Sequence, residues 1–130
     1  MPVASISVST PSVAEDGATN LVYTVTLDRA ASTDTVVNVG WSGSATAGND
    51  FSGSQPLTIT ILAGQTSGSS SVTIDPTADS VYEPNETVIA TLGSGSGYTI
   101  SSTAGSVTGT ITNDDNVPVA SISVSTFLGV

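Results

Sequence analysis

The sequence predicts an all-β fold, a seven-stranded antiparallel β-sandwich of the immunoglobulin-like type. Three observations support this prediction. Apolar and polar residues alternate in short runs, which is the period of a half-buried strand. Gly, Ser, Asn, Asp and Pro gather between these runs, as they do in turns. No segment has the pattern of a credible helix, so we expect the runs to bury their apolar sides between two packed sheets.

Each strand is predicted from an alternating run that turn-forming residues bound. In the second run, every second residue from Leu21 to Leu27 is apolar, which predicts one buried face. Similar stripes of apolar residues occur at 37–41, 57–61 and 88–92. The seven predicted strands are 4–9, 20–27, 36–41, 57–62, 70–74, 87–92 and 106–112.

Composition limits the classes of partner. The 130 residues suit roughly one domain with its own core, and the absence of cysteine excludes disulfides and thiolate chemistry. Eleven acidic residues against the single basic residue Arg29 give a net charge of −10. Such a charge argues against nucleic acid and against anionic membranes, and no apolar run is long enough for insertion into a bilayer. Cations are therefore the expected partners.

A repeated segment predicts a tandem organisation. Nine residues at 2–10, PVASISVST, recur without change at 118–126, a period of 118 − 2 = 116 residues. We therefore expect residues 1–116 to form one β-sandwich repeat. Residues 117–130 are expected to be either the start of the next repeat or an extra C-terminal strand exchanged between subunits.

The order of the strands predicts where the acidic residues gather. If each turn reverses the chain, successive loops alternate between the two ends of the sandwich. Eight of the eleven acids then share one end. Like charges about 5 Å apart repel by roughly 3 kcal/mol at an effective dielectric constant near 20, so this end calls for a counter-ion. The eight are Glu15, Asp16, Asp50, Asp79, Glu83, Glu86, Asp114 and Asp115.

Calcium is the predicted ion. It takes six to eight oxygen ligands from several flexible loops, whereas magnesium requires a tighter octahedral shell and ranks second. Zinc is disfavoured because the chain has neither His nor Cys. Asp16 is a secondary candidate, because in Glu15-Asp16-Gly17 it has the alternative role of starting a turn.

Five motifs follow one another in a recognisable order along the chain. They are SVAEDG at 12–17, ATAGNDF at 45–51, AGQTS at 63–67, DSVYEPNET at 79–87 and GTITNDD at 109–115. Through these motifs, residues 4–115 resemble the Calx-beta domain family, which occurs in sodium/calcium exchangers, integrin subunits and long bacterial surface proteins. Ala78 and Asn113 depart from the family pattern at positions where an acid is common, and fewer ions or weaker binding would follow.

The resemblance implies a β-sandwich of the Calx-beta type and a set of calcium ligands. In calcium-binding members the ligands come from the acids of the first, second, fourth and last motifs. The matching residues here are Glu15, Asp50, Asp79, Glu83, Glu86, Asp114 and Asp115.

Together these observations predict a binding domain and no enzyme, because a serine or threonine nucleophile would lack its usual base in a chain without His, Cys or Lys. We expect an extracellular or cell-surface repeat, as in a bacterial adhesin or surface fibre. Its partners would be identical repeats joined head to tail through calcium-stiffened junctions. Two alternatives stay open: a filament subunit joined by strand exchange of residues 119–126, and a calcium-sensing regulatory domain. No receptor or glycan is predicted.

Overall fold

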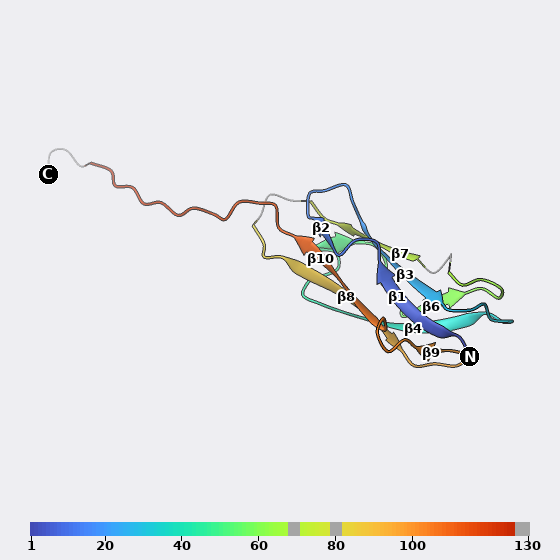
Figure 1. Cartoon of the computed structure of the whole chain (residues 1–130). Coiled ribbons are helices and arrows are strands. Elements are labelled where there is room, and N and C mark those ends of the chain that lie inside the picture. Colours follow the sequence, from blue (N-terminus) through green and yellow to red (C-terminus); the bar gives the residue numbers. More distant parts are fainter. Residues whose placement is uncertain (68–70, 79–81, 127–130) are drawn as a thin grey trace.

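The computed structural model describes residues 1–67, 71–78 and 82–126, and it confirms the predicted all-β sandwich. Two sheets of five strands each pack face to face (Figure 1). No helix occurs among these residues, and hence none that could cross a membrane. The strands run lengthwise, so that the loops gather at the two ends of the sandwich.

The first sheet has β1 in an interior position. Because β1 is antiparallel to β3 and parallel to β9, its backbone is hydrogen-bonded on both sides. On the β9 side, the Ile6 amide donates to the Ala104 carbonyl at 2.9 Å. In spatial order the sheet consists of β5 (Phe51–Ser52), β7 (Ser71–Pro76), β3 (Leu21–Leu27), β1 (Val3–Val8) and β9 (Thr99–Ile100).

The second sheet begins where the chain crosses over after β1. The crossing takes place between Val8 and Ser12, and β2 then runs parallel to β10. This arrangement places the residues that follow β2 beside those that follow β10. In spatial order the sheet consists of β2 (Ser12–Ala14), β10 (Ser106–Thr112), β8 (Glu86–Gly93), β4 (Thr35–Ser42) and β6 (Thr58–Ile61).

The core lies between the sheets and follows the predicted alternation. Leu21, Tyr23 and Val25 on β3 are fully buried, while the intervening residues face outward. The Tyr23 hydroxyl donates a 2.7 Å hydrogen bond to the Val88 carbonyl of the opposite sheet. Trp41 packs edge-on against Tyr23, with ring centroids 5.2 Å apart. A polar link inside an apolar core therefore fixes how the two sheets face each other.

Two details differ from the prediction. The short strands β2, β5 and β9 raise the number of strands in the described ranges from seven to ten, because two or three residues are too few to show an alternation. Leu57 precedes β6 and is 74% exposed, so it does not belong to the buried stripe.

In the single chain, residues 117–126 are not paired with either sheet and extend away from the sandwich (Figure 1). Both predicted roles of the C-terminal segment, the start of a next repeat and a strand exchanged between subunits, need a second unit, so they stay predictions.

Candidate metal site

A first group of three carboxylates comes together because the chain crosses from the first sheet to the second after β1. Glu15 and Asp16 follow β2, and Asp115 follows β10. The parallel pairing of these strands continues beyond their ends, where the Glu15 amide donates to the Thr112 carbonyl at 3.0 Å. Two segments about a hundred residues apart in the sequence therefore end side by side.

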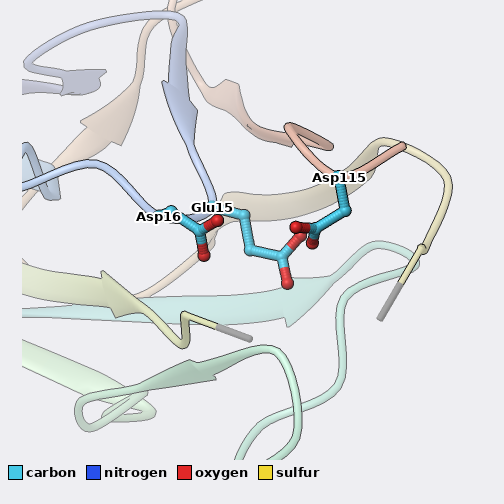
Figure 2. A group of neighbouring side chains, drawn as sticks. All are labelled: Glu15, Asp16 and Asp115. Carbon is cyan, nitrogen blue, oxygen red and sulfur yellow. The ribbon is translucent and has the colours of Figure 1, made fainter. Parts of the chain in front are cut away.

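In this first group, one carboxylate oxygen each from Glu15, Asp16 and Asp115 lies within 4.8 Å of the other two. Figure 2 shows the side chains of Glu15 and Asp115 pointing toward one another from their two loops. Glu15 is buried, with 6% of its surface exposed. A carboxylate so far removed from water needs strong polar partners, because burial of an uncompensated charge costs several kcal/mol.

The second group comes from two other loops. Asp50, Glu83 and Glu86 also offer carboxylate oxygens that lie within 4.8 Å of one another. Asp50 is held by a tight turn: its carboxylate accepts a 2.6 Å hydrogen bond from the Thr46 amide, and its own amide donates to the Thr46 carbonyl. Glu86 opens β8, so the sheet fixes its position.

The charges of the second group perturb one another. Burial, followed by a hydrogen bond to Asp50 and the charges of Asp50 and Glu83, raises the pKa of Glu86 to about 7. Burial would also raise the pKa of Asp50, but hydrogen bonds involving Glu86, Thr46 and Glu83 outweigh it and lower that pKa. Asp50 and Glu86 therefore titrate as a pair that retains a proton to nearly neutral pH.

The second group and Glu15 of the first group line one hollow at the end of the sandwich, and Asn113 links the two groups. The Asn113 Oδ1 atom accepts hydrogen bonds from the backbone amides of Glu83 at 3.4 Å and Asp115 at 3.2 Å. Its amide therefore joins the loop of one group to the loop of the other. The hollow is lined by Glu15, Asp50, Glu83, Pro84, Glu86, Ile111 and Asn113.

The structure brings most of the predicted ligands together at one end of the sandwich. It also divides them between two groups, which the sequence did not predict. The Asp114 carboxylate accepts a 3.0 Å hydrogen bond from the Asp16 amide and belongs to neither three-residue group. Asp16, only a secondary candidate, belongs to the first group. Asp79 lies outside the described residues. The predicted ligands that the two groups contain are Glu15, Asp50, Glu83, Glu86 and Asp115.

Two features of the site escaped the sequence analysis. The division into two groups depends on which loops adjoin across the sheets, and the order of the strands does not give that pairing. In the sequence, Asn113 is only a departure from an acidic pattern, whereas in the structure its side-chain amide links two loops. An Asn two residues before Asp115 was the available signal, because Asn side chains commonly hydrogen-bond to the backbone two residues on.

The donor set fits a calcium ion. Its ligands lie 2.3–2.6 Å from the metal, so opposite ligands are about 5 Å apart, and carboxylate oxygens that lie within 4.8 Å of one another are close enough to share one such ion. The sequence supplies neither His nor Cys, so a site with nitrogen or sulfur side-chain ligands is excluded.

The fold is similar to that of several solved structures. CBD12 from CALX1.2 matches with a TM-score of 0.66 at 21% identity, over 85% of this chain and 45% of that one. The apo-form Calx CBD1 domain matches with a TM-score of 0.62 at 21% identity, over 87% and 99%. The calcium binding domain CBD12 of CALX1.1 matches with a TM-score of 0.64 at 24% identity, over 80% and 41%.

This chain thus spans less than half of the two CBD12 structures and nearly all of the CBD1 domain. No family model and no curated protein matches the sequence. At these identities the likeness concerns the fold alone, and it shows that the chain folds as a Calx-beta-like β-sandwich.

Proposed function

We propose that this chain is a calcium-binding β-sandwich domain. The observation that carries the proposal is that two three-carboxylate groups from separate loops lie at a single end of the sandwich, where the second group and Glu15 of the first line one hollow. Three carboxylates in contact repel one another, and a divalent cation between them removes that cost. Backbone carbonyls, Asn side chains and water would complete a shell of six to eight oxygens.

The comparison with solved structures supports the choice of ion. One of the similar structures is described as a calcium binding domain, and this chain shares its fold over 80% of its own length. Carboxylates contributed by several loops suit the six to eight oxygen ligands of calcium better than the tight octahedral shell of magnesium, which we rank second.

We further propose that the domain is a structural repeat of an extracellular or cell-surface fibre, with identical repeats joined head to tail. Only Asn116 and Val117 separate Asp115 from the segment that repeats residues 2–10. A cation held by Asp115 would immobilise the start of this short linker, and successive units would then be joined stiffly. Calcium would act here as a structural ion with no catalytic role.

Thermal unfolding of the 130-residue chain tests the binding proposal. The melting temperature is measured in EDTA, in calcium and in magnesium at equal ionic strength. A ligand present at 100 times its dissociation constant stabilises the folded state by about 2.7 kcal/mol, so we expect a rise of several degrees in millimolar calcium and a smaller one in magnesium. An unchanged melting temperature in calcium would refute the proposal.

Backbone ¹⁵N relaxation at Asn116 and Val117 tests the stiffened junction separately. We expect calcium to reduce the nanosecond motion of these two amides and to leave residues 119–126 mobile in the isolated chain. If calcium stabilises the domain while both linker amides keep their motion, the ion binds but does not stiffen the junction.

A further inference from the structure

The segment 118–126 has the sequence of β1 and none of its environment. Ile6 is 3% exposed in β1, whereas Ile122, at the equivalent place in the repeated segment, is 99% exposed. Val119 and Val124 are more than nine-tenths exposed as well. No charged residue occurs from Asn116 to Thr126. An uncharged, alternating segment with open backbone groups is a strand that lacks a sheet.

The position that suits this segment is defined by β1 itself. Around β1, the Thr99 and Ser101 amides donate to the Pro2 and Ala4 carbonyls at 2.9 and 2.8 Å. On the other side β1 pairs with β3 along five consecutive residues. Because the nine residues are identical, every one of these backbone and side-chain contacts is available to 118–126 in the same register.

The segment cannot reach this position in its own domain. β10 ends beside β2, at the end of the sandwich where β1 also ends, whereas Pro118 would have to lie where β1 begins. The length of β1 is about 17 Å at 3.3 Å per residue. Asp115 is tied to Asn113, and the three steps from Asp115 to Pro118 span at most about 11 Å. In a chain of these 130 residues, the segment can therefore take this position only in another molecule.

We propose that residues 118–126 are a donor strand that binds between β3 and β9 of a second copy of this chain, in the place of β1. The proposal does not depend on calcium. In an intact acceptor, the donor strand competes with the acceptor's own β1, which has the same sequence. Both strands make the same contacts with β3 and β9, so the concentration of the chain decides which of them is bound. A tethered strand has an effective concentration in the millimolar range, so exchange becomes substantial when the chain concentration approaches that value.

Cross-linking of the full chain tests this register, since the chain has no native cysteine. In β1, Ser7 lies opposite Thr24 and Ser5 lies opposite Thr26. In an exchanged pair, Ser123 takes the place of Ser7 and therefore meets Thr24. One chain carries Ser123→Cys, and it is refolded at about 1 mM with a second chain that carries Thr24→Cys, then oxidised. The matched control places the acceptor cysteine two residues away, as Thr26→Cys.

We expect the mixed disulfide with Thr24→Cys to form at least ten times faster than that with Thr26→Cys, in EDTA and in calcium alike. Adding Ile122→Asp to the donor chain should abolish the difference, and because Ile122 is exposed this change leaves the donor domain folded. Equal rates at the two acceptor positions would show random collision and overturn the proposal. So would a preference that survives Ile122→Asp, or the absence of any mixed disulfide.

Discussion

The side-chain amide of Asn113 donates a 2.8 Å hydrogen bond from Nδ2 to the backbone carbonyl of Asp115. The same side chain accepts from the Glu83 and Asp115 amides, so it uses both halves of an amide at once. A carboxylate at this place would only accept, and it would face the Asp115 carbonyl as a like partner. Asn113 therefore positions the two loops between which it lies.

We predict that Asn113→Asp weakens calcium binding even though it adds a negative charge. Residues that orient metal ligands typically contribute ten- to a hundredfold to metal affinity, so we expect a loss of about tenfold by calorimetry. Asn116→Asp is the matched control, since it adds the same charge at an exposed position three residues further on. Tighter binding in Asn113→Asp than in Asn116→Asp would mean that this position prefers a ligand.

Glu15→Gln should change stability in opposite directions with and without calcium. In EDTA the substitution removes a buried charge from a group of three carboxylates, and we expect a gain of about 1 kcal/mol in the free energy of unfolding after allowance for solvent screening. In calcium it removes a ligand, and the stabilisation by the ion should shrink.

Urea unfolding in the two conditions measures both effects. Asp75→Asn is the control, because it removes one negative charge from an exposed position outside both groups. If Glu15→Gln and Asp75→Asn respond alike to calcium, Glu15 is not part of the metal site.

Alkaline pH should loosen the core through Tyr23. Burial raises the pKa of Tyr23 to about 12, although a hydrogen bond with the Gly109 backbone lowers it. Below pH 10 the phenol is protonated in both the folded and the unfolded state, and its contribution is fully present. Between pH 10 and pH 12 only the unfolded state ionises, so stability falls by about 2.5 kcal/mol in total.

Denaturant unfolding in EDTA at intervals from pH 9 to pH 12 follows this loss. Tyr23→Phe cannot ionise, so its stability should vary less over the same interval, although it is lower at neutral pH because the Val88 carbonyl loses its partner. Equal slopes for the native chain and the variant would assign the alkaline sensitivity to other groups.

Gly109→Ala should be among the more damaging single-methyl additions. A Cβ at Gly109 would overlap the Tyr23 hydroxyl and come within 2.9 Å of the Leu21 Cδ1 atom, and both side chains are fully buried. Overpacking of this kind costs about 1–3 kcal/mol. At Gly40 the nearest atom is the Thr91 carbonyl oxygen at 3.8 Å, so Gly40→Ala should be neutral or slightly stabilising.

Thermal unfolding compares the two alanine variants. The double variant Gly109→Ala/Tyr23→Phe should lose less stability than the sum of the single changes, because the hydroxyl that the new methyl group meets is gone. Additive losses would show that the cost arises elsewhere in the core.

The sequence was sufficient for the long strands and for the end at which the acids gather. The alternation from Leu21 to Leu27 is unmistakable because each inward residue is large and apolar. The rule of alternating loop ends then placed Glu15, Asp50 and Asp115 at one end of the sandwich, and they do lie there. The alternation of residues therefore predicts the long strands, and the reversal of the chain at each turn predicts the end at which the acids lie.

The finer arrangement of the site could not be predicted, because it depends on neighbours that are distant in the sequence. That Asp16 joins Glu15 and Asp115 follows from the parallel pairing of β2 and β10, and a three-residue strand leaves no periodic signal. The exposure of Leu57 likewise depends on where β6 begins, and strand ends are set by partners.

The two termini leave the sandwich at opposite ends (Figure 1), and this has a mechanical consequence. A chain pulled by its ends loads β1 against β3 and β10 against β8 along the strand axes. Because the hydrogen bonds between antiparallel strands run across the pull, they bear the load together and do not open one by one. A head-to-tail fibre of such units would resist tension by shear, with Glu15 and Asp115, which follow β2 and β10, near the point where the force passes from one unit to the next.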